Sequence, residues 1–599
     1  MIFFRKVDGR SYRRSLCQTS VPSAIWAKAP FLAGLLVAGW TAVGHAPGQD
    51  LQTNEKQKSV HGTVINAVTH TPIARALVYS LDNRFAMMTD SEGRFEFSLP
   101  KEGSQEESGA LAPRSYIASS FGAARNQLGL MARKPGFLDD RKESGEMEAS
   151  PGDEITISLM PEALIKGRVT LSTNDPATGV SVQLFLKELH DGLSRWVPGP
   201  SARANSAGEF RFAELPAGSY KLLTHELMDN DPVGTVPGGQ LYGFPPVYYP
   251  GAADFAAAAP IELLAGQTVE ADLSLTRQPY YDVRIPVANG EVNGLNVQVY
   301  PQGQRAPGYS LGYNGAEHRV EGLLPNGNYV VEGEVMGTDS ATGTVNIKVA
   351  GGPVAGPTLT LIPNGSISLD VKEEFSDTKW NGSTSWSDGR HTFSSRGARA
   401  YLQVTAETAD DSGQPRIGSV RPPTRPNDNS LVLENLPPGR YWLRLSTSRG
   451  YVAAATMGTT DLLREPMVVA PGANTTIEIK MRDDGAELEG SLGNLSAESS
   501  MTGAAAAAGL YSPKAWVYCV PLPDSAGQFQ QLGVSSDGTF TSPMMTPGDY
   551  RVLAFARQQP NLPYRDPEAM RAYESKGPVI HLAAGQKATV QVQVIANSE

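Results

Sequence analysis

The stretch NSAGEFRFAELPAGSYKLL, residues 205–223, contains the pattern that much of the chain repeats. Phe210 and Phe212 alternate with polar residues, so both rings point to the same face of a strand. The segment Leu-Pro-Ala-Gly then supplies a fixed φ and a residue that tolerates positive φ, which favours a tight turn. A second alternating run follows from Tyr220. The stretch therefore predicts two strands joined by a turn, with the aromatic face in a core.

Weaker copies of this stretch recur at a nearly fixed interval. Aligned on the turn and the tyrosine that follows it, they place four tyrosines 109, 112 and 109 residues apart: Tyr220, Tyr329, Tyr441 and Tyr550. The copy around Tyr329 is the loosest, because His318 and Val320 stand where the phenylalanines were. A period of this length fits one small domain per copy and indicates tandem modules.

Length and composition agree with this interpretation. A chain of 599 residues is too long for a single core. The 61 glycines and 44 prolines separate short runs of aromatic and β-branched residues, a composition typical of strands and turns. We expect an all-β protein, a tandem array of about five β-sandwich modules after an N-terminal signal segment.

Residues 1–46 have the features of a secretory leader. Six basic residues precede an apolar run at 31–43, and Gly44-His45-Ala46 resembles a small-residue cleavage site. The run of 13 residues is shorter than the roughly 20 that span a bilayer, and an uncleaved anchor is the alternative. We therefore expect an exported protein in the periplasm, on the outer cell surface or outside the cell.

Charge and cysteine content restrict the partners. After residue 46 the chain holds 45 basic and 61 acidic residues, a net charge of −16, which argues against nucleic acid as a partner. Cys17 lies in the leader, so Cys519 remains alone and no internal disulfide can form. Cys519 lies in a strand-like run, where we expect a buried small residue.

The segment 59–100 carries motifs of a known family. Gly-x-Val at 62–64, Pro-Ile-x-x-Ala-x-Val at 72–78 and Thr-Asp-x-x-Gly-x-Phe-x-Phe at 89–97 resemble the carboxypeptidase regulatory-like module. The resemblance implies a transthyretin-like, carbohydrate-binding-like β-sandwich in a bacterial envelope or extracellular setting, with a role in adhesion, ligand capture or spacing. Residues 101–125 depart from the family pattern as a polar insertion.

Turns with glycine followed by alternating strands close five modules. We expect β-sandwiches at residues 57–161, 162–277, 278–363, 364–483 and 484–599. Three stretches do not fit the sandwich pattern, and we expect them to be loops: 242–251, 376–397 and 494–509. A short helix is expected at 567–576, with proline at its start and glycine just past its end.

Motifs that suggest catalysis or metal binding lack the necessary context. Ser310 lies in Gly-x-Ser-x-Gly, but neither a buried parallel strand nor a helix flanks it, so a glycine-rich hairpin loop is the expected structure. His318 and Glu321 match His-x-x-Glu, yet residues three apart on a strand face opposite sides. Asp90 and Glu92 offer too few oxygens for calcium. We expect no enzyme activity, no metal and no cofactor, and the alternative is a secreted hydrolase that uses Ser310 or His318.

Aromatic residues in the irregular stretches are the candidate ligand-binding residues. Trp380 and Trp386 have no counterpart in the other repeats, so the module core does not account for them. The second group is Tyr242, Phe244, Tyr248 and Tyr249; the alternative for all six is that they cover a module junction. We expect an exported, non-catalytic binding or structural protein whose partner is a glycan or an envelope protein, without a transmembrane barrel.

Overall fold

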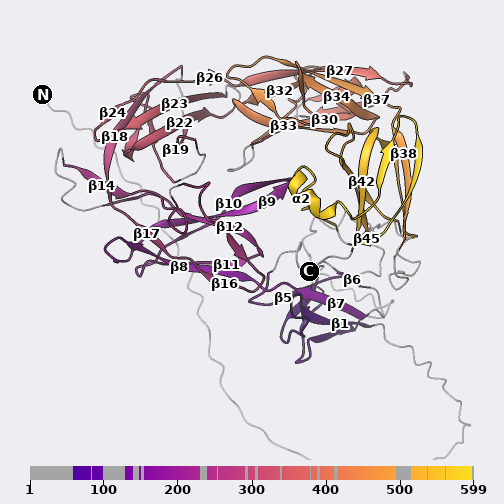
Figure 1. Ribbon diagram of the computed structural model, residues 1–599, viewed down its shortest axis with the longest axis horizontal. Helices are drawn as coiled ribbons and strands as arrows, with labels where there is room; N and C mark the ends of the chain where they lie inside the picture. Colours follow the sequence, from indigo (N-terminus) through magenta and orange to yellow (C-terminus); the bar gives the residue numbers. More distant parts are fainter. Residues whose placement is uncertain are drawn as a thin grey trace, which may run out of the picture. The chain divides into compact units, whose positions relative to one another are not determined.

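The structure is a computed structural model, and its described residues belong to the compact unit formed by residues 57–599. They are 59–81, 84–98, 128–138, 147–149, 154–229, 239–252, 254–289, 294–303, 308–337, 340–377, 379–387, 391–409, 416–493, 515–535, 537–556, 558–559 and 561–595. The predicted leader at 1–46, the insertion at 101–125 and the stretch 494–509 lie outside these residues. Strands make up most of the described chain (Figure 1), which confirms the all-β class.

The first two sandwiches each pair a sheet built on their first strand with a second sheet. In the first, β4 (Arg94–Ser98), β1 (Ser59–Asn66) and β7 (Glu154–Leu159) face β3 (Ala86–Met88), β2 (Leu77–Ser80), β5 (Leu128–Arg133) and β6 (Met147–Ala149). In the second, β11 (Glu209–Leu215), β8 (Ala163–Leu171), β16 (Thr268–Glu270) and β17 (Leu273–Leu275) face β10 (Leu193–Arg203), β9 (Ser181–His190), β12 (Gly218–Thr224) and β15 (Ile261–Leu263).

The third sandwich also recruits strands from the preceding segment. One sheet holds β13 (Leu227–Met228), β14 (Leu241–Phe244), β18 (Gln278–Ala288), β21 (Arg319–Pro325) and β20 (Gly312–Asn314), with β24 (Val354–Ala355) and β25 (Leu359–Thr360) beside β18. The other holds β19 (Asn296–Pro301), β22 (Gly327–Val335), β23 (Ala341–Val349) and β26 (Ile362–Pro363).

The last two sandwiches follow the same plan. In the fourth, β32 (Leu431–Leu436), β27 (Gly365–Glu374), β37 (Thr476–Arg482), β34 (Tyr451–Met457) and β35 (Thr460–Asp461) face β31 (Ile417–Ser419), β30 (Leu402–Thr408), β33 (Gly439–Thr447) and β36 (Met467–Val469). In the fifth, β41 (Thr539–Met545), β38 (Ala486–Leu492) and β44 (Lys587–Val592) face β40 (Gln530–Gly533), β39 (Trp516–Pro521), β42 (Gly548–Phe555) and β43 (Val579–Leu582), with β45 (Val594–Ile595) beside β42.

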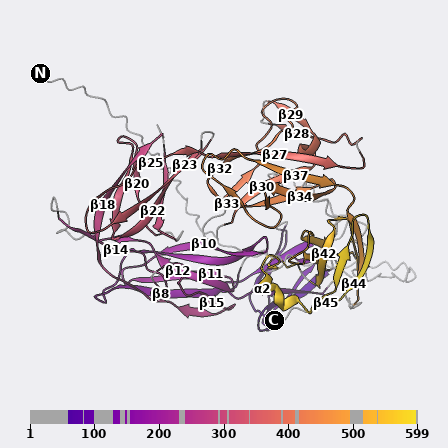
Figure 2. The ribbon, with the colours of Figure 1, turned by 45° about the horizontal axis from the view of Figure 1, so that its top comes forward.

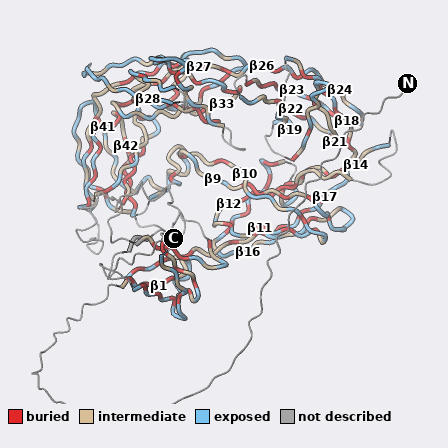
Figure 3. The backbone as a smooth tube through the Cα atoms, turned by 180° about the vertical axis from the view of Figure 1, so that it is seen from behind, coloured by how far each residue is buried: buried red, intermediate tan, exposed pale blue. Residues whose placement is uncertain are grey.

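One strand arrangement is common to all five sandwiches. The first strand pairs antiparallel with the strand before the repeat turn and parallel with one or two strands near the end of the module, as β27 does with β32 and β37. The five main hydrophobic clusters span residues 60–159, 163–275, 283–361, 367–481 and 486–592. Strand residues alternate between buried and exposed (Figure 3). We propose that each of these clusters is the core of one module.

The four repeat tyrosines make the same contact in four sandwiches. Each is buried in the strand after the turn, and its hydroxyl donates to the backbone carbonyl four residues earlier, in the turn itself. The distances are 2.8 Å from Tyr220 to Pro216, 3.1 Å from Tyr329 to Pro325, 2.8 Å from Tyr441 to Pro437 and 2.6 Å from Tyr550 to Thr546. The repeated tyrosine therefore both fills the core and satisfies a carbonyl of the turn, as in a tyrosine corner.

Two of the stretches expected to be loops contain strands. Residues 376–397 include β28 (Ser383–Ser387) and β29 (Thr392–Arg396), a separate hairpin before the 3-10 turn η2 (Gly397–Ala400) (Figure 2). The expectation of a loop was wrong here because nearly all side chains of this hairpin are exposed, so no buried face imposes an alternating pattern. In the stretch 242–251, β14 joins the sheet of the third sandwich through β18.

The expected helix at 567–576 is shorter and tighter than its sequence suggests. It consists of α2 (Pro567–Met570) and the 3-10 turn η5 (Arg571–Tyr573). Asp566 caps α2 by accepting bonds from the amides of Glu568 and Ala569. Among the described residues, no helix is long and apolar enough to cross a membrane.

Candidate functional site

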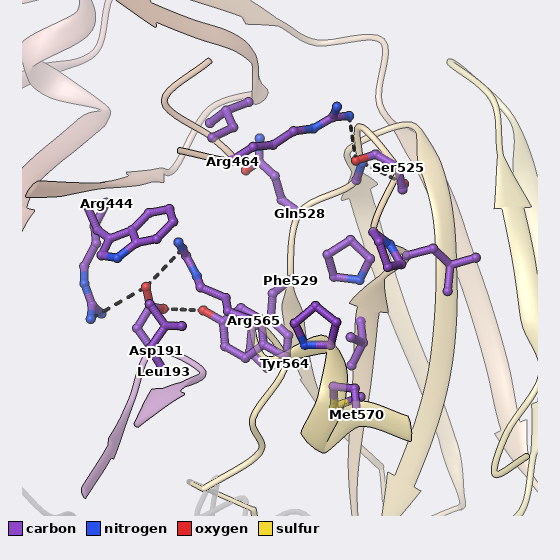
Figure 4. A pocket seen from close by; sticks show the side chains of 18 of the residues that line it. Asp191, Leu193, Arg444, Arg464, Ser525, Gln528, Phe529, Tyr564, Arg565 and Met570 are labelled. Carbon is purple, nitrogen blue, oxygen red and sulfur yellow. Dashed lines mark hydrogen bonds and ion pairs between the residues drawn. The ribbon is translucent and has the colours of Figure 1, made fainter. Parts of the chain in front are cut away.

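One hollow is a cleft of about 910 Å³ lined by residues of three sandwiches (Figure 4). The second sandwich contributes the tip of the β9–β10 hairpin, and the fourth contributes residues of β30 and β33 with Leu463 and Arg464. The fifth contributes Arg551 and residues within 520–529 and 564–574. This volume falls within the range typical of ligand pockets. The cleft is therefore the first candidate site.

The hairpin tip that enters the cleft is a two-residue turn. Asp191 and Gly192 both have positive φ, 52° and 77°, the conformation of a type I′ turn between β9 and β10. The Asp191 carboxylate lies 3.0 Å from Arg565 Nη2 and 3.7 Å from Arg444 Nη2, and it accepts a hydrogen bond from the Tyr564 hydroxyl (Figure 4). The cleft thus already binds one carboxylate, which belongs to the chain itself.

A buried ion-pair network lies next to this tip. The Glu407 carboxylate is 3% exposed and lies 2.6 Å from Arg444 Nη2 and 3.2 Å from His190 Nε2. Arg195 donates to the other oxygen of Glu407. Since Arg444 contacts both Asp191 and Glu407, the network ties the β9–β10 hairpin to β30 and β33. The groups that surround a buried carboxylate in this way hold each other in fixed positions.

Aromatic rings form one wall of the cleft. Phe529 and Tyr564 stack with their ring centroids 3.8 Å apart, and the Arg565 guanidinium lies 4.8 Å from the centre of the Trp442 ring. Burial raises the pKa of Tyr564 to about 12, so its hydroxyl stays protonated and can donate at neutral pH. The wall therefore offers flat apolar surfaces beside fixed hydrogen-bond donors.

The charge of the cleft is opposite to that of the chain. Among the described lining residues, five are arginines, Arg444, Arg464, Arg551, Arg565 and Arg571, whereas two are acids, Asp191 and Glu574. The chain after the predicted leader carries a net charge of −16. Because low-dielectric walls concentrate such a field, the cleft attracts anions within an acidic protein.

The two predicted tryptophans lie in the fourth sandwich, in contact with different rings. Trp380 lines a smaller hollow of about 290 Å³, where it packs edge-on against Tyr401 at 5.4 Å. The Arg449 guanidinium lies 5.0 Å from the centre of the Trp380 ring. Trp386, on β28, stacks nearly parallel to Phe393 on β29, with centroids 6.0 Å apart. Both tryptophans stay more than a third exposed, at 36% and 37%.

The tyrosine loop lies at the junction of the second and third sandwiches. Phe244 and Tyr248 are buried in clusters of the second sandwich, and Tyr249 packs against the same core. Tyr242 lies on β14, with the Arg277 guanidinium 3.9 Å from its ring centre. The structure does not bring these residues to either hollow.

The residues that suggested catalysis have structural partners. Ser310 lies between β19 and β20, two strands of different sheets, and not in a strand-to-helix elbow; its hydroxyl donates to the Glu226 carboxylate at 2.6 Å. Glu321 pairs with Arg319 at 2.5 Å, and His318 precedes β21. Among the described residues, no group of three or more His, Cys, Asp and Glu could hold a metal ion.

Two further expectations concern single residues. The Asp90 carboxylate accepts bonds from the amides of Glu92 and Arg94, which confirms that it serves the turn. Cys519 is fully buried on β39, as expected, and burial raises the pKa of its thiol to about 12.

The residues of the large cleft were not predicted from the sequence. Trp442 belongs to the fourth sandwich and Tyr564 and Arg565 to the fifth, so their meeting depends on contacts between modules. One signal was available: Tyr441 points into the core, and strand alternation then places Trp442 on the outer face. An outward tryptophan on a regular strand suggests a contact surface.

The fold and its hollows define the class of molecule, an array of β-sandwiches with an interdomain cleft. No protein-family model matches the chain, and no curated protein matches it. Solved structures with some similarity include the TIE protein of Bacillus anthracis, which is 11% identical with a TM-score of 0.14. The aligned part covers 68% of this chain and 65% of the TIE protein, just under two thirds of its length.

Two further similar structures are pilins. A minor pilin of Streptococcus agalactiae is 12% identical with a TM-score of 0.17, covering 37% of this chain and 97% of that one. The major pilin subunit of Bacillus cereus is 11% identical with a TM-score of 0.13, covering 53% of this chain and 99% of that one. At such TM-scores these similarities support no assignment, so the fold rests on the strand pairing described above.

Proposed function

We propose that the chain is an exported, non-catalytic binding protein of the bacterial cell envelope, with a carbohydrate or a protein as its ligand. The observation that supports this function is the exposure of Trp380 and Trp386. Neither ring belongs to the hydrophobic cluster of the fourth sandwich, and both lie in or beside a hairpin outside its two sheets. Large aromatic residues without a core role often contact a ligand.

The two tryptophans offer complementary kinds of contact. The Trp386 ring lies nearly parallel to Phe393, so the pair presents a flat aromatic surface on an exposed hairpin. Trp380 lies beside Arg449, Glu373 and Asp377, which supply charged groups around the smaller hollow. A flat ring next to a few polar groups suits a sugar ring or a side chain of a partner protein.

A hydrolase is the alternative, and the local geometry favours binding. The Ser310 hydroxyl donates to Glu226 in a connection between strands of two different sheets, and the carboxylate of Glu321 is paired with Arg319. A serine nucleophile needs an exposed elbow, and a glutamate that binds zinc needs a carboxylate without another partner. Ser310→Ala and His318→Ala should leave any hydrolytic activity of the preparation unchanged. A loss of esterase or carboxypeptidase turnover in either variant would favour the alternative.

The test of the proposed function compares stability with binding. Trp380→Ala and Trp386→Ala should each weaken binding by about 1 to 3 kcal/mol in a glycan and peptidoglycan screen, because tryptophans at interfaces often act as hot spots. The melting temperature should change little. Trp196→Ala is the matched control, since Trp196 packs on Phe255 in the second sandwich and should affect melting rather than binding. A large drop in melting temperature with unchanged affinity in the tryptophan variants would refute the proposal.

A further inference from the structure

We propose that the large cleft between the second, fourth and fifth sandwiches is a second binding site, and that its ligand is an acidic oligosaccharide with carboxylate groups. This site is separate from the tryptophan hairpin of the proposed function. The cleft and the smaller hollow share none of their lining residues. The inference rests on four properties of the cleft: an internal carboxylate, an excess of arginines, half-buried aromatic rings and an open volume.

The internal carboxylate shows what the cleft recognises. Asp191 enters from the β9–β10 hairpin, where it pairs with Arg565 and accepts a hydrogen bond from Tyr564. The Arg444 guanidinium, which is closer to Glu407, lies 3.7 Å from the same carboxylate. Two guanidinium groups and a hydroxyl around one carboxylate form a strong, charge-assisted arrangement. The same donors can bind a carboxylate of a ligand beside Asp191 or in its place.

The remaining arginines provide positive charge beyond what Asp191 neutralises. Arg551 donates to the backbone carbonyl of Glu574, and Arg464 donates to that of Ser525 at 2.9 Å. Arg464 also has a longer contact of 3.7 Å with Asp461. A carbonyl bears no net charge, so the charge of Arg551 stays available to an anion, whereas the Asp461 carboxylate partly neutralises the charge of Arg464. Arg571, exposed on η5, adds a further guanidinium to the lining.

The rest of the lining favours a sugar over an acidic peptide. Trp442 and Phe529 provide flat rings, which suit the C–H faces of a pyranose. Amide and hydroxyl side chains also line the cleft and can bond sugar hydroxyls: Gln403, Thr405, Ser446 and Gln528. A sugar ligand that carries both carboxylates and hydroxyls can contact the arginines, the aromatic rings and the amide and hydroxyl side chains of the cleft.

The unfilled volume separates a ligand site from a simple junction. Contacts that only hold domains together are packed about as densely as protein interiors. Here the hairpin tip is packed tightly, because a Cβ on Gly192 would lie 2.7 Å from the Tyr564 ring, yet about 910 Å³ remains open beside it. Tight packing of the tip holds the arginines in place, and the open space is where the oligosaccharide binds.

Calorimetric titration of the chain without its leader tests this site with three matched probes. Tetragalacturonate should bind, whereas its methyl ester, which has the same rings without the charge, should bind at least about tenfold more weakly. Tetraglutamate supplies carboxylates without sugar rings and should also bind more weakly than tetragalacturonate. Raising the ionic strength should weaken the binding of tetragalacturonate.

Variants locate the binding in the cleft. Arg571→Gln and Trp442→Leu should each weaken tetragalacturonate binding roughly fivefold to tenfold, and Asp191→Asn should strengthen it by removing the competing charge. Arg211→Gln, an exposed arginine on β11 outside the cleft, should leave the affinity unchanged. Trp386→Ala should also leave it unchanged, so a failure of this site is distinguishable from a failure of the tryptophan hairpin. Circular dichroism and melting temperature check the folding of each variant.

Several results would overturn the inference. Equal binding of the methyl ester would show that charge does not matter, and stronger binding of tetraglutamate would assign the cleft to an acidic peptide. An unchanged affinity in Arg571→Gln together with Trp442→Leu, both folded, would place the binding elsewhere. If tetragalacturonate gave no heat of binding with either the wild type or Asp191→Asn, the cleft would be only a junction between sandwiches and not a binding site.

Discussion

Replacing Tyr550 by phenylalanine should open the fifth sandwich, because this tyrosine has two hydrogen-bond partners in the core. Its hydroxyl is buried, donates to the Thr546 carbonyl at 2.6 Å and accepts a bond from the Gln528 amide at 3.0 Å. The phenyl ring preserves the packing but leaves both backbone groups without that partner. Each buried group left unsatisfied costs about 1 to 3 kcal/mol, so the fifth sandwich should lose roughly 2 to 6 kcal/mol.

Cys519 is a built-in reporter for this change. It lies in the same hydrophobic cluster as Tyr550, and its raised pKa of about 12 makes the thiol unreactive while the core is closed. With Cys17 of the leader replaced by serine, a thiol reagent labels Cys519 only when the fifth sandwich opens. A loss of about 2 kcal/mol or more raises the open population, and hence the labelling rate, by at least roughly 30-fold.

The matched control is the same substitution in another sandwich. Tyr220→Phe removes the bond to Pro216 in the second sandwich and should leave the labelling of Cys519 nearly unchanged. If Tyr550→Phe did not accelerate labelling, the hydroxyl would not stabilise the core as argued. If Tyr220→Phe accelerated it equally, the sandwiches would unfold together rather than as separate modules.

Two other substitutions test local features. Gly192→Ala should destabilise the hairpin tip by about 1 to 3 kcal/mol, because the new Cβ would lie 2.7 Å from the Tyr564 ring and the backbone φ at this position is positive. Amide hydrogen exchange at the tip should therefore become faster. Unchanged exchange there would contradict this prediction. Asp428→Asn should destabilise the fourth sandwich by about 3 kcal/mol at pH 7, since Arg421 lies 3.0 Å from this buried carboxylate. A hydrogen bond from Ser430 holds the pKa of Asp428 below its ordinary value, so this stability is present above about pH 4 and lost as the pH falls further. The difference in melting temperature between wild type and variant should therefore shrink from pH 7 to pH 2, and a constant difference would exclude the explanation.

The module fold was largely predictable because one short pattern carries most of its constraints. The alternation of Phe210 and Phe212 indicates a buried strand face, the turn indicates chain reversal, and Tyr220 indicates a filled core. All three are local properties of the sequence. The β28–β29 hairpin was missed because Trp386 and its neighbours face solvent on both sides. Exposed strands held only by backbone pairing leave no alternation to detect.

The large cleft could not be predicted for a different reason. Its residues are ordinary within their own sandwiches: Asp191 is a turn residue, and Tyr564 precedes a short helix. Their roles arise only when the hairpin of one sandwich docks on two others, about 250 and 370 residues further along the chain. The candidate tryptophans and tyrosines could be selected from the sequence because they lie in segments that differ from the repeat around them; their role in binding stays a prediction.

The parallel pairing of the first and last strands gives each sandwich a definite response to pulling. The chain enters at one end of the first strand and leaves at the opposite end of the last, so tension makes the two strands slide past each other and loads their hydrogen bonds together. In the fourth sandwich this ladder joins Ser368–Glu374 to Thr476–Arg482 without interruption. In the third it is split between the two-residue strands β24 and β25. Judged by the length of the continuous parallel ladder, the fourth sandwich should resist tension along the chain best, and the third should extend first.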